Sequence, residues 1–140
     1  MFRDIQQFLR RTLIGNAVFS TASALVCIAA APGLATQIAM APKQFVALGV
    51  QLLVFAAILA FLGTRSRLDH GGVLSAVIFF GLADLLWVVG SAKGLQAGVA
   101  LTALGQFLVL GVAVVVGVFG VLELVGAIAL MRQRRAVATA

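Results

Sequence analysis

Four apolar runs, each long enough to cross a lipid bilayer as a helix, dominate the sequence. A spanning helix needs about 20 mostly apolar residues, because each residue adds about 1.5 Å and the hydrocarbon core is about 30 Å thick. The runs cover about residues 12–31, 44–63, 71–92 and 100–131. Pro32 and Gly33 end the first run, because this pair does not continue a helix comfortably. The sequence therefore predicts an all-α integral membrane four-helix bundle, a single transmembrane domain over residues 1–140.

Composition excludes the soluble alternative. Hydrophobic residues make up 63% of the chain, and only 10% of it is Asp, Glu, Lys or Arg. Soluble proteins carry about 25% charged residues, which cover the surface of their core. We therefore expect the lipid bilayer to be the chain's main partner.

The last apolar run is too long for one straight crossing. Counted from Gly94 to Met131 it would reach about 57 Å at 1.5 Å per residue, roughly twice the hydrocarbon thickness. We expect a turn over Gly94–Ala100, so that the span begins at Ala100 or Gly105 and tilts or protrudes at one end. The spacing of Gly90, Gly94 and Gly98 resembles a helix-packing motif, but its place at the end of a span favours the turn.

Basic residues are divided unequally between the two sides of the predicted bundle. One side carries eight of them, namely Arg3, Arg10, Arg11, Arg65, Arg67, Arg132, Arg134 and Arg135, and the other carries Lys43 and Lys93. Because short loops rich in Lys and Arg stay in the cytoplasm, both termini are predicted to lie inside, in the inner membrane of a cell. The net charge of +6 is spread between the apolar runs and forms no groove-sized surface, which argues against nucleic acid binding.

The N-terminus permits two interpretations. Met1–Arg11 has apolar residues at helical spacing beside arginines, which predicts a short amphipathic helix in the cytoplasmic interface. Alternatively, Arg10 and Arg11 before an apolar run that ends in Ala29–Ala31 resemble a cleavable signal peptide, whose removal would leave three spans.

Two acids lie inside the predicted spans, where an ionised side chain costs about 2.5–3.5 kcal/mol on insertion scales. Taking Gly71 and Met131 as the cytoplasmic ends places Asp84 about 20 Å deep and Glu123 about 12 Å deep. This separation argues against a close carboxyl pair. No Lys or Arg lies inside any span to neutralise either acid, so each is expected to be protonated or hydrogen-bonded.

Amides at matching depth are the predicted partners of these acids. Gln51 is the candidate for Asp84, and Asn16 is the candidate for Glu123. On the first span one face carries small and polar residues at steps of three and four, which predicts that this face contacts protein. Its members are Asn16, Ser20, Ser23, Ala24 and Cys27.

The third span places an acid, an indole and a hydroxyl on one side. Asp84, Trp87 and Ser91 follow steps of three and four. They either line a ligand pocket, or they serve as a membrane-interface anchor (Trp87) and as helix-to-helix contacts (Asp84 and Ser91).

Chemical groups for catalysis or cofactor binding are scarce. Cys27 and His70 are the only residues of their types, so a Cys-based zinc site, a disulfide or bis-histidine haem ligation within the chain is excluded. No phosphate loop, catalytic triad or metalloprotease motif occurs. We therefore expect no metal, no cofactor and no enzymatic activity.

Three segments carry a family resemblance. "GNAVFS" (Gly15–Ser20), "LLVFAAILAFL" (Leu52–Leu62) and "ADLLWVVGS" (Ala83–Ser91), in this order, are similar to a group of small uncharacterised bacterial four-span membrane proteins. The resemblance implies a four-helix membrane bundle and no particular activity.

Two functional hypotheses follow. The first is a non-catalytic bundle that self-assembles into a homo-oligomer or serves as an accessory subunit of a larger membrane complex. The second is a carrier or binder of small lipophilic or cationic molecules that uses Asp84 and Glu123. Its candidate site residues are Asp84, Glu123, Trp87, Gln51, Asn16 and Ser91.

Overall fold

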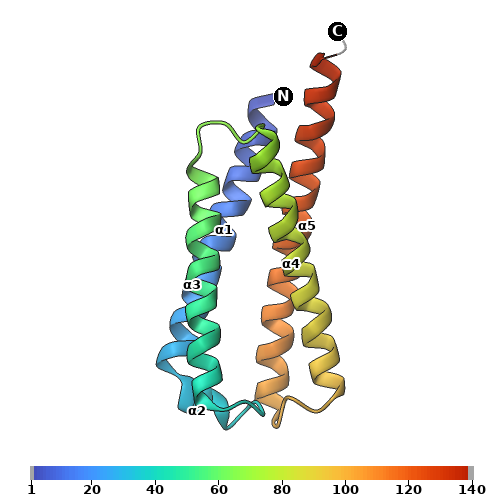
Figure 1. Cartoon of the computed structure of the whole chain (residues 1–140). Coiled ribbons are helices and arrows are strands. Elements are labelled where there is room, and N and C mark those ends of the chain that lie inside the picture. Colours follow the sequence, from blue (N-terminus) through green and yellow to red (C-terminus); the bar gives the residue numbers. More distant parts are fainter. Residues whose placement is uncertain (1, 139–140) are drawn as a thin grey trace.

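The computed structural model describes residues 2–138, and four of its helices are long and apolar enough to cross a membrane. These helices run alternately up and down, as Figure 1 shows. In chain order the helices are α1 (Phe2–Ala29), the short α2 (Ala31–Ala35), α3 (Pro42–Thr64), α4 (Gly71–Gln96) and α5 (Ala103–Ala138). The predicted all-α bundle is confirmed.

Helix ends follow local sequence signals. Pro42 occupies the first turn of α3, where no backbone hydrogen bond is lost, and the Gln44 side chain accepts a hydrogen bond from the Ala41 N–H at 2.6 Å. The hydroxyl of Thr102 accepts a hydrogen bond from the Gly105 N–H at 3.0 Å, which caps the start of α5. Gly98 lies two residues after the end of α4 and has a φ of 80°, a left-handed conformation that glycine adopts without strain.

Three details differ from the sequence-based expectation. Pro32 and Gly33 were predicted to interrupt helical structure, but α1 ends before them at Ala29 and both lie within α2, where Pro32 occupies the first turn. The amphipathic N-terminal segment is not a separate helix, because α1 continues through it without a break, with Leu9 fully buried and Phe8 exposed. The turn after α4 begins later than predicted, because Gly94 still belongs to the helix, which ends at Gln96.

The helices form two pairs. Helix α1 packs most extensively against α3, and α4 packs most extensively against α5, while the two pairs are joined mainly along α1 and α5. The backbones of α3 and α4 do not approach closely, and the two helices meet through side chains near the basic end, where the ring centroids of Phe55 and Phe80 are 5.1 Å apart. The bundle is therefore closed on its α1–α5 side and loosely closed on its α3–α4 side.

Arginines hold the helices together at the end of the bundle that contains the start of α1, the link between α3 and α4, and the end of α5 (Figure 1). Arg10 donates a hydrogen bond to the Arg65 carbonyl oxygen at 2.7 Å, and Arg134 donates one to the Asp69 carbonyl oxygen at 3.3 Å. We call this the basic end. Arginines from α1, the link and α5 therefore gather at one end, as the charge pattern predicted, although the side of the membrane that they face stays a prediction.

A backbone clasp closes the opposite, distal end. Residues 37–39 lie beside residues 99–102 in an antiparallel bridge, with Ala39 N–H donating to the Val99 carbonyl at 2.6 Å and Leu101 N–H donating to the Gln37 carbonyl at 2.9 Å. This distal clasp ties the α1–α3 pair to the α4–α5 pair.

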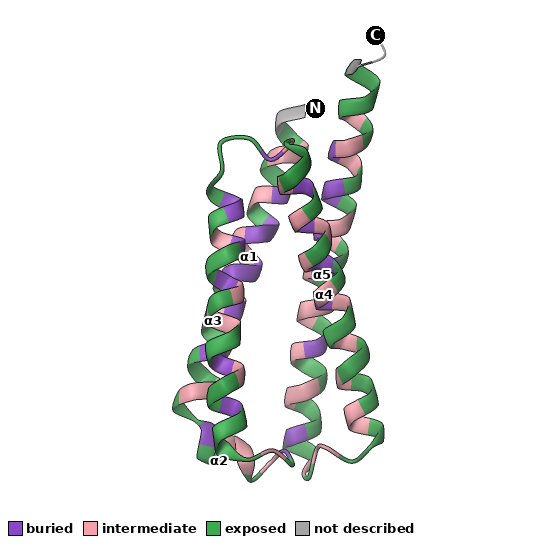
Figure 2. Cartoon of the chain, viewed as in Figure 1, coloured by how far each residue is buried: buried purple, intermediate pink, exposed green. Residues whose placement is uncertain are grey.

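The main hydrophobic core lies in the half of the bundle near the basic end. It contains the fully buried Leu9, Leu13 and Leu59, and Leu68 from the link folds down into it. Figure 2 shows buried residues on the facing sides of the helices. A smaller cluster of Ala31, Ile38 and Phe45 lies beneath the distal clasp.

Candidate functional site

Three polar side chains from three helices meet inside the bundle. The Asn16 amide nitrogen on α1 donates to Oδ2 of Asp84 on α4 at 2.7 Å and to Oε1 of Glu123 on α5 at 2.8 Å. The two hydrogens of one amide group thus serve two carboxyls. Ser20 in turn donates from Oγ to Oδ1 of Asn16 at 3.3 Å. We call Asn16, Asp84 and Glu123 the Asn16 cluster.

The Asn16 cluster is deeply buried. The exposed fraction is 1% for Asn16, 5% for Asp84 and 0% for Glu123. Polar groups that lie away from water at this depth require hydrogen-bond partners, and the cluster supplies most of them internally. The predicted pairing of Asn16 with Glu123 is confirmed, and the polar stripe of α1 faces protein at Asn16, Ser20 and Ala24.

The expectation that the two acids lie far apart is wrong. That expectation placed Met131 at the same depth as Gly71. Helix α5 instead continues to Ala138, and Arg134 is the residue that contacts the link before α4. Measured from Arg134, Glu123 lies about 16 Å inside, against about 20 Å for Asp84 measured from Gly71. The tilt and crossing of the helices accommodate the small remaining difference.

Glycines allow α4 and α5 to approach at this level. A Cβ atom on Gly81 would lie 3.1 Å from the Gly120 carbonyl oxygen, and one on Gly120 would lie 3.0 Å from the Cβ of Asp84. Small residues permit this close backbone contact between membrane helices. Their positions one turn before Asp84 and one turn before Glu123 bring both carboxyls to the same amide.

One oxygen of the cluster has no partner. Glu123 Oε2 is buried and accepts no hydrogen bond from any residue that the structure describes. A buried acceptor without a partner costs about 1–3 kcal/mol, so the cluster retains unused binding capacity.

A cavity lies beside the Asn16 cluster, in the half of the bundle between the cluster and the distal clasp. Its volume is about 970 Å³, and its walls come from α1, α3, α4, α5 and the clasp. Phe19 and Ala83 line it, and each is close in sequence to a cluster residue: Ala83 directly precedes Asp84, and Phe19 lies one turn after Asn16. We call this space the α3–α4 cavity.

Several predicted site residues line this cavity rather than joining the cluster. They are Gln51 on α3 and Trp87 and Ser91 on α4. The Asp84 carboxyl is bonded to Asn16, so the predicted pairing of Gln51 with Asp84 is wrong. Trp87 is 41% exposed, and its indole shares the cavity wall with Gln51 and Ser91.

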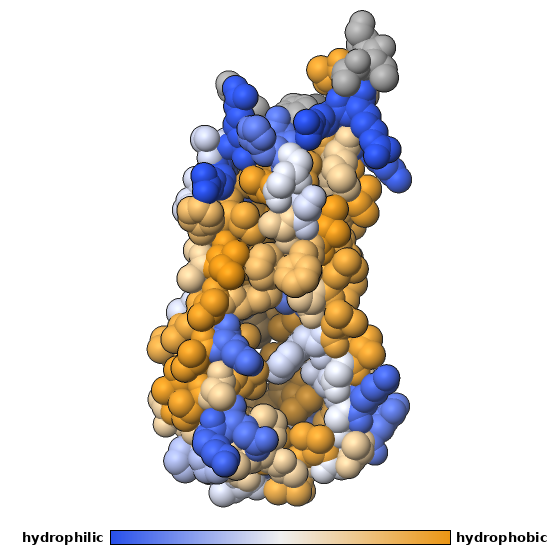
Figure 3. Space-filling model, viewed as in Figure 1, coloured by the Kyte–Doolittle hydropathy of each residue, from blue (hydrophilic) through white to orange (hydrophobic). Residues whose placement is uncertain are grey.

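The cavity opens toward the side of the bundle. Figure 3 shows a hollow between α3 and α4 in the distal half, with hydrophilic and pale patches at its rim and mostly apolar surface inside it. Because the backbones of α3 and α4 stay apart in the distal half, the opening faces the region that lipid would occupy around the four spans.

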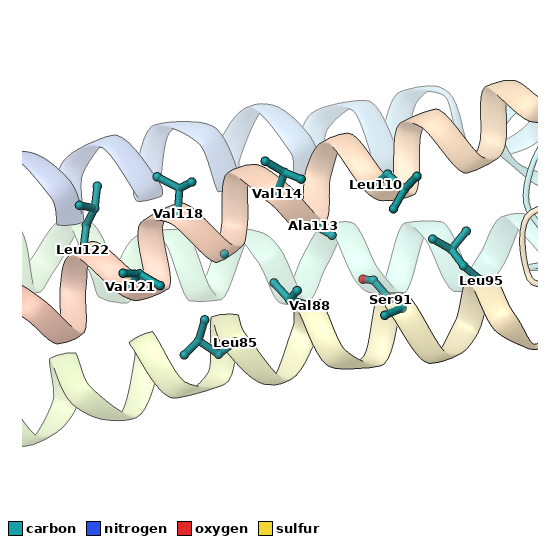
Figure 4. A pocket seen from close by; sticks show the side chains of 12 residues that line it. Leu85, Val88, Ser91, Leu95, Leu110, Ala113, Val114, Val118, Val121 and Leu122 are labelled. Carbon is teal, nitrogen blue, oxygen red and sulfur yellow. The ribbon is translucent and has the colours of Figure 1, made fainter.

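A second pocket lacks comparable chemistry. It is a groove of about 500 Å³ between α4 and α5, in which Leu85 and Val88 face Val118 and Val121 (Figure 4). Ser91 supplies the one oxygen among its labelled side chains. Lipid chains suffice to fill such a groove.

The sequence predicted a ligand pocket as one of two interpretations of the third span, and Trp87 and Ser91 do line the cavity, but it did not predict the part that α1 contributes. Ser23 and Cys27 were assigned to a protein-facing stripe, but they line the α3–α4 cavity together with Phe19 and Gln44. Hydropathy indicates which segments span a membrane, but it does not indicate which neighbouring helices separate.

Comparison with known proteins returned no match to a protein-family model, a curated protein or a solved structure. The resemblance to small bacterial four-span proteins therefore stays a prediction, and the function is inferred from the geometry of this chain.

Proposed function

We propose that this chain is a non-catalytic multi-pass membrane protein that binds a small lipophilic molecule in the α3–α4 cavity. The observation that carries the proposal is the cavity itself, which has a volume of about 970 Å³ and borders the distal cluster at Ile38 and Phe45. Ligand pockets occupy about 300–1,000 Å³ and combine mostly apolar walls with a few polar groups that orient the ligand.

The walls have this combination. Apolar side chains such as Phe19, Phe45 and Leu86 form most of the surface, and Ser23, Gln51 and Ser91 supply hydroxyl and amide groups. A molecule with a compact hydrocarbon body and one hydrogen-bonding group fits these walls. Entry between α3 and α4 allows it to arrive from the bilayer.

Cys27 provides a native reporter for the test, because it is the only cysteine in the chain and it lines the cavity. The protein in lipid nanodiscs is treated with methyl methanethiosulfonate, a small uncharged thiol reagent, over a series of 1-adamantanol concentrations. We expect 1-adamantanol to slow the modification of Cys27 in a saturable manner. Modification that is unaffected, or that slows in proportion to concentration without saturating, contradicts the proposal.

Two matched pairs control for effects on the membrane. Leu25 lies two residues from Cys27 and is 56% exposed outside the cavity, so Leu25→Cys with Cys27→Ala should give a reporter that 1-adamantanol does not protect. Gly90 lines the cavity and Gly111 does not, and an added Cβ meets nothing at either position. Gly90→Phe should therefore weaken protection of Cys27, whereas Gly111→Phe should leave it intact.

A second candidate function is assembly, because the loosely closed α3–α4 side is also a surface that a second copy or a partner helix can cover. Leu86 is 70% exposed on this side, and Val114 is 65% exposed on α5. In a Cys27→Ala background, oxidative cross-linking of Leu86→Cys into dimers in native membranes, with no cross-linking of Val114→Cys, would favour assembly. Equal behaviour of the two variants would contradict it.

We further propose that the protein lies in a bacterial inner membrane with both termini in the cytoplasm. The support is the division of basic residues, because Arg10, Arg65 and Arg134 belong to the basic end, while Lys43 and Lys93 belong to the distal half. Short positively charged loops are retained on the cytoplasmic side.

A further inference from the structure

We infer that the molecule bound in the α3–α4 cavity is a lipophilic amine whose positive charge pairs with the carboxyls of Asp84 and Glu123. This inference names the ligand class for the proposed function and rests on it. Four observations support it: the missing counter-charge, the unpartnered oxygen, the access to Asp84 and the aromatic wall.

The acids of the Asn16 cluster have no basic partner. Every Lys and Arg of the chain lies outside the middle of the spans, and the hydrogen-bond donor that reaches both Asp84 and Glu123 is the neutral Asn16 amide. Acids inside a membrane normally pair with another group or mark the path of a substrate or ion. A cationic ligand supplies the positive charge that no Lys or Arg of the chain places beside the two acids.

The unpartnered oxygen requires a donor. Glu123 Oε2 receives no hydrogen bond from any described residue. Glu123 lies outside the cavity wall, so the ligand pairs with it through the charge of the neighbouring Asp84 site rather than by direct contact in this conformation. A primary ammonium group carries three N–H donors and a full charge, whereas an alcohol carries a single neutral donor. Hydrogen bonds between charged partners are roughly twice as strong as neutral ones.

Asp84 is the acid that a ligand in the cavity reaches first. It keeps 5% of its surface exposed, while Glu123 keeps none, and the residues around it in α4, Ala83 and Trp87, both line the cavity. Neither acid is part of the cavity wall, so a head group that pairs with Asp84 must extend beyond the wall between Ala83 and Trp87. Glu123 then completes the anionic side of the site through the hydrogen bonds that both acids share with Asn16.

Trp87 provides a further surface that favours a cation. It lies one helical turn from Asp84 and belongs to the cavity wall. The face of an indole ring attracts ammonium groups that lie within about 6 Å of it. Neither the indole face nor the carboxyl of Asp84 favours a lipophilic anion.

The test compares probes of one shape and different charge. Protection of Cys27 in lipid nanodiscs is measured with 1-adamantylamine, 1-adamantanol and 1-adamantanecarboxylate. We expect the amine to give half-protection at a concentration about tenfold or more below that of the alcohol, because one hydrogen bond between charged partners strengthens binding by at least that factor. The carboxylate should be the weakest of the three.

Variants assign the preference to the two acids. Asp84→Asn and Glu123→Gln keep the shape of the side chains and remove the charge, so the ratio between the amine and the alcohol should fall toward one. Asp69→Asn removes an acid from the link outside the spans and should keep the wild-type ratio. Asp84→Glu retains a carboxylate and should preserve a preference for the amine.

Failure of the inference can be separated from failure of the proposed function. Saturable protection by the alcohol with no advantage of the amine overturns the inference and leaves the proposed function standing. No saturable protection by any of the three probes overturns both. If Asp84→Asn and Glu123→Gln do not fold, the three wild-type curves decide, and a carboxylate as effective as the amine overturns the inference.

Discussion

Gly81 and Gly120 face one another where α4 meets α5, so closely that a Cβ atom on Gly120 would lie 2.9 Å from the Gly81 carbonyl oxygen. Real Cβ atoms almost never approach a backbone oxygen so closely, so a larger residue at either position must push the two helices apart. Because Asp84 lies next to Gly120, this contact also sets the position of its carboxyl.

Gly120→Ala is therefore expected to destabilise the bundle by about 1–3 kcal/mol, the usual cost of overpacking a tight interface. Reversible unfolding in mixed micelles measures the change. Gly111→Ala is the matched control on the same helix, because a Cβ added there meets nothing. A Gly120→Ala variant as stable as Gly111→Ala would show that α4 and α5 are not in close contact.

Asn16→Ala should destabilise the bundle by about 1–2 kcal/mol, because it removes the shared donor of two buried carboxyls. Thr21→Ala is the control, because the Thr21 hydroxyl bonds only to the Ala17 carbonyl of its own helix. If the cost arises from the acids, Asn16→Ala should be milder in a chain that carries Asp84→Leu and Glu123→Leu. An equal loss of unfolding free energy in both backgrounds would show that Asn16 does not stabilise the bundle through the two acids.

Gly105→Ala should open the distal clasp. An added Cβ would meet the carbonyl oxygen of Gln37, the atom that accepts hydrogen bonds from Leu101 and Thr102. We expect methyl methanethiosulfonate to modify Cys27 several times faster in this variant. Gly33→Ala, also near the distal end but with open space around its Cβ, should leave the rate unchanged. Unchanged reactivity in Gly105→Ala would show that the clasp does not limit access to the cavity.

Single cysteines test the proposed orientation. In a Cys27→Ser background, Thr36→Cys and Ser66→Cys place exposed thiols at opposite ends of the bundle. An impermeant maleimide should label Thr36→Cys on intact cells, and it should label Ser66→Cys only after the membrane is opened. Labelling of Ser66→Cys in unbroken cells would reverse the orientation.

The sequence determined the spans well and their mutual arrangement poorly. Helix α3 begins and ends close to the predicted limits, because Pro42 and the polar link after Thr64 are local signals. The meeting of Asp84 and Glu123 was missed, because hydropathy does not indicate how far α5 protrudes beyond its apolar part. The pairing of Asn16 with Glu123 was predicted, because a buried acid requires a polar partner and Asn16 is an amide inside the first span.

The separation of α3 from α4 could not be predicted. Both helices are apolar on all sides, and a hydrophobic surface that faces lipid has the same composition as one that faces another helix. The pattern of Trp87 and Ser91 therefore left both a ligand pocket and a helix contact open, and Gln51 was assigned to a contact with Asp84 although it lines the cavity.

The sideways opening of the α3–α4 cavity determines in which solvent its ligand competes. A molecule that enters between α3 and α4 leaves hydrocarbon for an equally apolar wall, so transfer out of water contributes little to its selection. Affinity then depends on the mole fraction of the molecule in the bilayer, and it falls as more lipid is added at constant total amount. Under these conditions the few polar atoms of the cavity and of the Asn16 cluster distinguish one hydrocarbon-rich molecule from another, because the bilayer interior supplies no hydrogen-bonding groups for the polar part of the ligand.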